Sequence, residues 1–165
     1  MKIIVAFIGL LALYQARAFE PTADSSAQTL DTVCWNDSLV RFAQNHLGTP
    51  YVYGGSSPKG FDCSGFVRYV FQQYNCTVPR SSSSYHSFND TIPLKEIQVG
   101  DILVFTGTNA AIRKPGHLGI VTNITENEII FIHSSSSKKH SGVVESKLYT
   151  TGYRKRYIKT LRLLP

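Results

Sequence analysis

Cys63, His117 and His133 are the residues whose types could do chemistry together. Cys63 follows Asp62 in the stretch FDCSGFV, and the apolar residues over 66–74 recur at helical spacing. Asp62 is a good N-cap, so we expect Cys63 in the first turn of that helix. Unpaired N–H groups and the helix dipole favour a thiolate there. The alternative is an inert, buried cysteine at the start of an amphipathic helix.

The strand pattern brings the two histidines together. The stretches 117–122 and 128–133 are predicted strands joined by a short loop. With the loop centred on residue 125, paired positions sum to 250, so His117 faces His133 and Ile120 faces Ile130. Residues that face each other in an antiparallel pair have Cβ atoms about 5 Å apart.

A thiol beside an imidazole suits nucleophilic catalysis. The imidazole removes the thiol proton and later protonates the leaving amine, while a third polar group orients the ring. We expect Cys63 as nucleophile, His117 as base and His133 as the orienting group, although the sequence leaves the two histidine roles interchangeable. Backbone N–H groups at the helix start would stabilise the oxyanion. Zinc binding by these three residues is the alternative, but a fourth ligand at recognisable spacing is missing. No metal or other cofactor is expected.

The elements that position these residues come as helices first and strands afterwards. Helices are expected over 36–47 and 63–74, separated by a glycine-rich loop, with a short helix near 82–88. A polar loop is expected over 134–142. The expected strands are 102–106, 117–122, 128–133 and 157–163. This order predicts an α+β fold with the N-terminal helices packed on an antiparallel sheet.

The chain length of 165 residues suits one domain with a full core. Residues 1–18 combine a positive start, an apolar run at 3–14 and a small-residue end, which is typical of a secretory signal peptide and too short for a membrane span. We expect a flexible leader over 19–35 and a single catalytic domain over 36–165. The protein is therefore expected to be secreted, extracellular, monomeric and without a membrane span.

The chain without its first 18 residues keeps three cysteines, and an odd number leaves one thiol unpaired. Cys34 precedes one predicted helix and Cys76 follows the other, so antiparallel packing of these helices favours a Cys34–Cys76 disulfide and leaves Cys63 free. All three pairings stay open. Four N-x-S/T sequons indicate a glycosylating, eukaryotic secretory route: Asn36, Asn75, Asn89 and Asn123.

The net charge is +6, and it becomes +4 when the signal peptide and its Lys2 and Arg17 are removed. A basic surface suits anionic partners such as bacterial wall polymers, and a solvated basic face without a partner is the alternative. No stacking-aromatic or helix-in-groove motif supports binding to nucleic acid.

Six motifs resemble, in order, those of the NlpC-type cell-wall cysteine peptidases: YVYGG at 51–55, GFDCSGFV at 60–67, PRSS at 79–82, GDILVF at 100–105, HLGI at 117–120 and IH at 132–133. The resemblance implies a papain-like fold and hydrolysis of peptidoglycan stem peptides after D-γ-glutamate, before diaminopimelate or lysine. It also implies Cys63 as nucleophile, His117 as base and His133 as the third polar residue.

The resemblance also implies substrate-binding residues. Tyr51 matches a tyrosine of the family, and Asp62 and Ser64 would hold the stem peptide through the amine of its L-alanine. Arg80, with Ser82 beside it, would meet a substrate carboxylate through a charge-assisted bond. A purely capping Asp62 and an exposed helper Arg80 are the alternatives. Many relatives carry a glutamine where this chain has Tyr85-His86.

The signal peptide and sequons favour a secreted hydrolase that attacks bacteria in defence or digestion. Two other functions stay open: an N-acetylmuramoyl-L-alanine amidase of the Cys–His type, and a non-catalytic protein that binds bacterial cell wall. The SH3-like or LysM wall-targeting domains of many bacterial relatives have no counterpart in the sequence.

Overall fold

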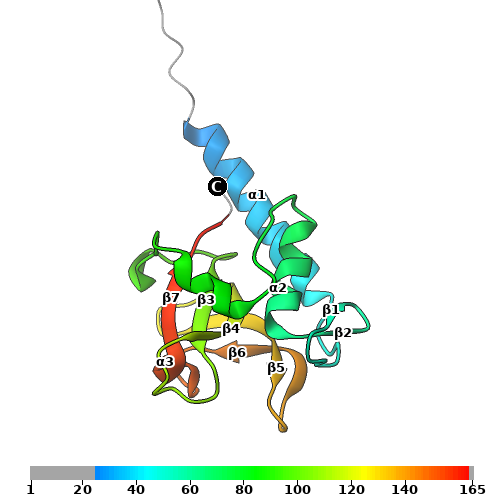
Figure 1. Ribbon diagram of the computed structural model, residues 1–165. Coiled ribbons are helices and arrows are strands. Elements are labelled where there is room, and N and C mark those ends of the chain that lie inside the picture. Colours follow the sequence, from blue (N-terminus) through cyan, green and yellow to red (C-terminus); the bar gives the residue numbers. More distant parts are fainter. Residues whose placement is uncertain (1–24, 164–165) are drawn as a thin grey trace, which may run out of the picture.

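The computed structural model describes residues 25–163, with side chains from residue 35 onward. Two helices, α1 (Ser25–Gln44) and α2 (Cys63–Gln72), lie on one side of a five-stranded sheet (Figure 1). All neighbouring strands are antiparallel, in the order β6-β5-β4-β3-β7. The strands are β3 (Ile102–Thr106), β4 (Pro115–Ile124), β5 (Ile129–Ser136), β6 (Ser141–Lys147) and β7 (Tyr157–Leu161). The predicted α+β architecture is confirmed.

Smaller elements fill the connections. β1 (Ser56–Ser57) and β2 (Gly60–Phe61) form a two-stranded ribbon in the glycine-rich loop before α2. Two 3₁₀ helices, η1 (Ser82–Ser87) and η2 (Leu94–Glu96), precede β3, and η1 matches the short helix predicted near 82–88. The four-residue helix α3 (Tyr153–Arg156) leads directly into β7.

Two segments differ from the sequence-based prediction. Helix α1 begins at Ser25, so residues 25–35 are helical where a flexible leader was expected; glycine and proline are absent from 25–44, and nothing interrupts the helix. Strand β6 was not predicted, because Val143 and Val144 are its only large apolar residues. The predicted signal peptide at 1–18 and residues 19–24 lie outside the described residues. No helix within 25–163 is long and apolar enough to cross a membrane.

Two hydrophobic clusters lie on opposite faces of the sheet. Alternate residues of a strand point to opposite faces, and in β3 Ile102 and Val104 join the helix-side cluster while Leu103 and Phe105 join the other. The helix-side cluster includes Leu39 of α1 and, from α2, buried residues at helical spacing: Phe66, Val67, Val70 and Phe71. These contacts fix the start of α2 against the sheet.

Glu128 ties the start of β5 to the segment after β6. Its buried carboxylate accepts hydrogen bonds from the backbone N–H groups of Ile129 (3.0 Å), Tyr149 (2.8 Å) and Thr150 (3.1 Å), and from the Thr150 hydroxyl (2.8 Å). Burial acts to raise the pKa of Glu128, but these hydrogen bonds outweigh it and the pKa lies below its usual value.

We expect Glu128→Gln to lower the free energy of unfolding by about 2 kcal/mol at pH 7, because the amide replaces one charged acceptor oxygen with a donor. A carboxyl with a depressed folded-state pKa stabilises the fold above its unfolded value near 4.5 and loses that contribution as pH falls. Urea unfolding of both proteins at pH 7 and pH 3 tests this. The gap between parent and variant should narrow at pH 3, and an equal gap at both pH values would contradict the assignment.

Candidate active site

The start of α2 is built as the sequence predicts. Asp62 is the N-cap residue, and its carboxylate accepts a 2.6 Å hydrogen bond from the backbone N–H of Gly65. Cys63 is the first residue of the helix. Backbone N–H groups of Leu118, Ser64 and Cys63 itself face the thiol and favour its charged form. The contact with Leu118 places the thiol beside β4, next to His117.

The surroundings of the Cys63 thiol raise its pKa and so favour its protonated form. Burial raises its pKa first of all, and the negative charge of Asp62 raises it further, which together outweigh the three backbone N–H groups. A helix start alone therefore does not make this thiol a thiolate. The nucleophile depends on a base that removes its proton during the reaction.

The two histidines are in direct contact. Nε2 of His117 lies 2.9 Å from Nδ1 of His133, and the two rings are nearly perpendicular at 86°. Both side chains are buried, with His133 fully inaccessible to solvent. The predicted contact between these residues is confirmed.

The register that brings the histidines together differs from the predicted one. Ile120 pairs with Ile132, not with Ile130, and a bulge lies between Val121 and Asn123. Near the site paired positions thus sum to 252, so His117 and His133 are diagonal neighbours and do not face each other directly. Diagonal neighbours share a face and remain within reach of long side chains, which is why the contact forms in spite of the wrong register.

The hydrogen bonds fix the tautomer of each ring if His117 is the base. Its Nε2 is bonded to His133, so Nδ1 is the nitrogen left to accept a proton from Cys63. Nε2 of neutral His117 then carries the hydrogen and donates to Nδ1 of His133. Nε2 of His133 donates in turn to the hydroxyl of Ser146 at 2.9 Å. The hydrogen bonds are thus compatible with His117 as base and His133 as orienting group.

Three residues that the sequence did not indicate surround this pair. Ser146 comes from the unpredicted strand β6. The Tyr153 ring of α3 stacks on His117, and its hydroxyl lies 3.4 Å from Nε2 of His133. Arg156 sits over the Tyr153 ring at 5.0 Å and donates to the carbonyl of Thr106 at 3.0 Å. Each lies far from the histidines in sequence, and no local motif marks it.

Burial lowers the pKa of both histidines. The pKa of His133 falls to about 3, through burial and then the positive charge of Arg156. Burial lowers the pKa of His117 well below 6.5, with contributions from His133 and Arg156. Both rings are therefore neutral at neutral pH, which is the form that the base needs.

We expect activity to persist on the acid side of pH 6.5. A base with a lowered pKa stays unprotonated in mild acid, so kcat/KM should fall only as pH drops through the lowered pKa of His117. A profile of kcat/KM between pH 4 and pH 8 measures this. Half-loss of kcat/KM at pH 6.5 or above would contradict the burial of the base.

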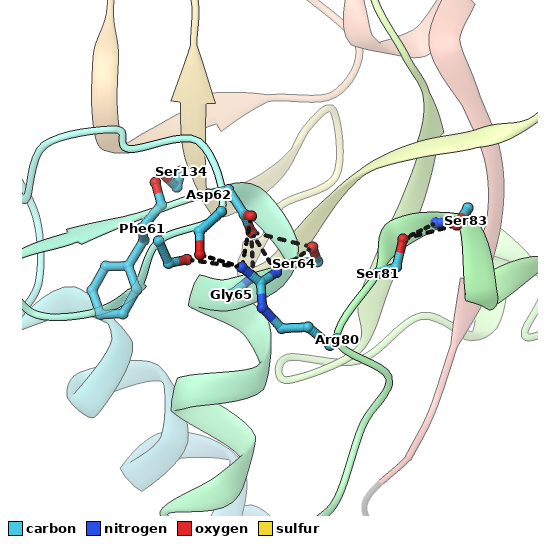
Figure 2. A network of polar contacts seen from close by, with 10 residues as sticks. Phe61, Asp62, Ser64, Gly65, Arg80, Ser81, Ser83 and Ser134 are labelled. Carbon is cyan, nitrogen blue, oxygen red and sulfur yellow. Dashed lines mark hydrogen bonds and ion pairs between the residues drawn. The ribbon is translucent and has the colours of Figure 1, made fainter.

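Asp62 and Arg80 form a shared network at the mouth of the site (Figure 2). The guanidinium of Arg80 contacts both carboxylate oxygens of Asp62, at 3.0 and 2.8 Å, and the hydroxyl of Ser64 at 3.2 Å. It also donates to the carbonyls of Gly54 (2.7 Å) and Gly55 (3.4 Å). Arg80 was expected to meet a substrate carboxylate, but its charge is already matched by Asp62.

The Asp62–Arg80 pair should support the fold as well as the site. The Asp62 side chain is only 13% exposed, so Arg80→Ala leaves a partly buried carboxylate without its cation, and we expect a loss of about 2 kcal/mol in unfolding free energy. Lys95→Ala is the matched control, because Lys95 and Glu96 form a pair at the surface, 81% and 59% exposed. Equal stability of the two variants in chemical denaturation would show that the Asp62–Arg80 pair is dispensable.

Close backbone contacts hold the glycine-rich loop over the helix start. A Cβ atom on Gly65 would lie 2.0 Å from the carbonyl oxygen of Gly55, so only glycine fits there. The backbones of Tyr51 and Phe61 form an isolated parallel β-bridge. Burial raises the pKa of Tyr51, with smaller contributions from Cys63 and Asp62, and Tyr51 lines the same pocket as the thiol.

A pocket of about 290 Å³ opens onto the thiol. All five residues that the resemblance assigned to substrate binding line it together with Cys63: Tyr51, Asp62, Ser64, Arg80 and Ser82. Tyr53 forms part of its rim and is 91% exposed. The structure therefore brings the predicted residues into one cavity, whose lining includes Gly116 beside His117 but neither histidine.

The model of the NlpC/P60 family matches residues 48–162. The chain belongs to the NlpC/P60 family. Its match begins just after α1 and covers the pocket, the nucleophile helix and the whole sheet. The predicted family is confirmed.

Named relatives and solved structures agree with the NlpC/P60 assignment. The chain is 38% identical over 105 residues to Gamma-DL-glutamyl hydrolase of Bacillus subtilis, covering 61% of this chain and 24% of that protein. It is 38% identical over 73 residues to the bifunctional muramidase/DL-endopeptidase CwlT of the same species, covering 44% and 22%. A solved NlpC/P60 family protein from Bacillus cereus superposes with a TM-score of 0.68 at 28% identity, covering 79% of this chain and 40% of that one. The chain thus spans about a quarter of these curated relatives.

Cys76 of the NlpC/P60 domain is a free cysteine, as is Cys63. The Cys76 thiol lies 3.7 Å from the carbonyl oxygen of Leu163. Because Cys76 is free, the predicted Cys34–Cys76 disulfide is not present in the structure. Within the described part of the chain, no three His, Cys, Asp or Glu side chains are grouped to hold a metal ion.

Proposed function

We propose that this NlpC/P60 domain is a cysteine peptidase that hydrolyses the stem peptides of bacterial peptidoglycan, at the bond between D-γ-glutamate and diaminopimelate or lysine. The observation that carries the proposal is the 2.9 Å bond between His117 and His133, in a chain whose helix-start thiol lies beside His117 and opens onto a pocket. The names of the relatives, a γ-glutamyl hydrolase and a DL-endopeptidase, support the same bond type.

The geometry supports a two-step acyl transfer. The thiol proton moves to Nδ1 of His117 as the Cys63 sulfur bonds to the scissile carbonyl carbon. Backbone N–H groups of Cys63 and Ser64 at the start of α2 are available for the oxyanion. His117 then protonates the leaving amine, the C–N bond breaks, and a thioester remains. Water that gives its proton to His117 hydrolyses the thioester and restores the thiol.

In both reaction steps His133 is a neutral hydrogen-bond acceptor for His117. It takes the hydrogen bond from Nε2 of His117 in the imidazole and imidazolium states alike. Unlike an aspartate in that place, it brings no negative charge to balance the imidazolium. The orientation of His117, rather than charge compensation, is therefore the contribution of His133.

The L-alanine end of the stem peptide would bind at Asp62 and Ser64. Asp62 carries a negative charge within the pocket, and a free amine could share it with Arg80. Tyr51 and Ser82 would border the same peptide. A free amine near the scissile bond is a feature of stem peptides already released from glycan, which would then be the preferred substrates.

Mass spectrometry of muropeptides after digestion tests the proposed bond, with the Cys63→Ala protein digested in parallel. An endopeptidase leaves shortened stems that end in D-glutamate. Free lactyl sugars with intact stem peptides would instead identify an amidase. Unchanged muropeptides from several wall chemotypes, together with sedimentation of the protein on the same walls, would support the wall-binding function.

We further propose that the protein is secreted and attacks bacteria. The signal-like segment at 1–18 and the sequons support secretion, and the side chains at three of the sequons are exposed: Asn75, Asn89 and Asn123. Expression in a eukaryotic host, followed by N-terminal sequencing of the secreted protein and glycosidase treatment, tests the route. An intact first residue, or protein retained in the cell, would contradict it. Lysis of live bacteria by the secreted protein tests the antibacterial role.

A further inference from the structure

A second groove adjoins the catalytic pocket. It has a volume of about 390 Å³ and is lined by Ser83, His86, Arg113, Lys114 and Pro115. Its walls are η1 and the approach to β4, and these two elements pack against each other. The catalytic pocket ends at Ser82 and Gly116, the chain neighbours of Ser83 and Pro115. A substrate held at Cys63 can therefore extend into this groove.

The groove is positively charged and carries no acidic side chain among its lining residues. Within the described part of the chain, only Arg80, Lys95 and Arg162 form ion pairs, so Arg113 and Lys114 have no carboxylate partner. Lys159 adds a third cation behind the η1 wall, where its Nζ donates to the backbone carbonyls of His86 and Phe88. Two cations without carboxylate partners beside a hydrolytic pocket favour the binding of an anionic group there.

Arg113 is held in place without its charge being neutralised, and His86 is also fixed by the backbone. The guanidinium of Arg113 donates to the carbonyls of Ala110 (3.5 Å), Lys155 (3.2 Å) and Tyr157, so the segment from α3 to β7 fixes its position. Nδ1 of His86 lies 2.9 Å from the carbonyl oxygen of Ser83, which fixes the imidazole ring against η1. The carbonyl oxygens around Arg113 orient its guanidinium and leave its positive charge available to an anion.

We propose that this groove is a carboxylate subsite, in which Arg113 and Lys114 bind the free α-carboxylate of the γ-linked glutamate at the scissile bond. The inference rests on the proposed function, because a γ-glutamyl bond uses the side-chain carboxyl and leaves the α-carboxylate free. An α-linked peptide has no such charge at that residue. The subsite would thus distinguish D-glutamate in a stem peptide from D-isoglutamine, whose α-carboxyl is an amide.

Two synthetic peptides test the subsite: L-Ala-γ-D-Glu-L-Lys and its D-isoglutamine analogue. We expect the parent protein to prefer the carboxylate peptide about tenfold in kcat/KM, as a hydrogen-bonded charge pair can supply. Lys114→Gln should remove the preference by raising KM for the carboxylate peptide alone, with kcat unchanged. Lys139→Gln is the control, because Lys139 is an exposed cation in the turn after β5.

Arg113→Gln provides a second variant; because Arg113 also holds the segment before β7, its folding is checked by circular dichroism. Absence of a preference in the parent, or an intact preference in both variants, would overturn the subsite while leaving the proposed function standing. If the parent cleaves neither peptide, the proposed function fails instead. In that case, calorimetric binding of both peptides to the Cys63→Ala protein still tests the subsite. Tighter binding of the carboxylate peptide, lost in the Cys63→Ala/Lys114→Gln protein, would support the subsite. Equal binding of the two peptides would refute it.

Discussion

Cys63→Ala is expected to abolish stem-peptide hydrolysis, with kcat/KM reduced by at least about 10⁴-fold. Among the described residues that line the pocket, Cys63 alone offers a thiol. That thiol lies at the start of α2, beside Leu118 and thus next to His117. Cys63→Ser should be nearly as inactive, because a hydroxyl is far harder to deprotonate and the pKa of His117 is low. Steady-state hydrolysis of the γ-D-glutamyl peptide measures both variants.

Cys76→Ser is the matched control for Cys63→Ala. Cys76 is the other free cysteine of the described chain, and it lies at the end of the core away from the pocket lining. Its replacement should leave kcat/KM within about twofold of the parent, since one weak sulfur hydrogen bond to Leu163 is all that changes. A Cys63→Ala protein that still digests wall, beside an active Cys76→Ser protein, would remove Cys63 from the mechanism.

His133→Leu is expected to lower kcat by about 10³-fold with little change in KM. Leucine cannot accept the hydrogen bond from Nε2 of His117, so the base loses both its tautomer and its orientation. His133→Asn should retain more activity, roughly tenfold below the parent, because an amide oxygen can stand near the position of Nδ1. Comparison of kcat for the two variants distinguishes the effect of losing the hydrogen-bond acceptor from the effect of losing the imidazole ring.

Ser146→Ala completes this series. It removes the acceptor at Nε2 of His133, but the Tyr153 hydroxyl at 3.4 Å remains nearby. We expect a loss in kcat below about tenfold. If His133→Asn were as inactive as His133→Leu while both proteins stayed folded by circular dichroism, the acceptor role of His133 would be refuted.

Local patterns in the sequence predicted the parts of the site that lie within one element. Short-range spacing predicted three features: Asp62 as the helix cap, Cys63 in the first turn, and the apolar face of that helix. The structure has all three. The histidine contact was also predicted, because a change of two in register keeps both residues on the same face. A shift by one residue would have separated them.

Contacts between distant elements could not be predicted in the same way. The bulge near Val121 depends on how β4 and β5 pack, and strand β6 has too few apolar residues to be recognised, although it supplies Ser146. Tyr153 and Arg156 reach the histidines only because α3 folds back over the sheet. Arg80 looked available to a substrate because its partner, Asp62, is 18 residues earlier in the chain.

The catalytic contact joins two halves of the chain that are assembled by different stretches of sequence. The thiol belongs to the N-terminal helices, and its base belongs to the sheet. Hydrogen bonds across this boundary are all long-range in sequence, as between Ser134 and the carbonyl of Phe61 (2.7 Å) or Gly48 and the carbonyl of Val143 (2.9 Å). Bringing such contacts together costs loop-closure entropy. In any chain in which these contacts have not formed, the thiol and the histidine pair are apart, so hydrolysis requires both parts of the fold to be docked.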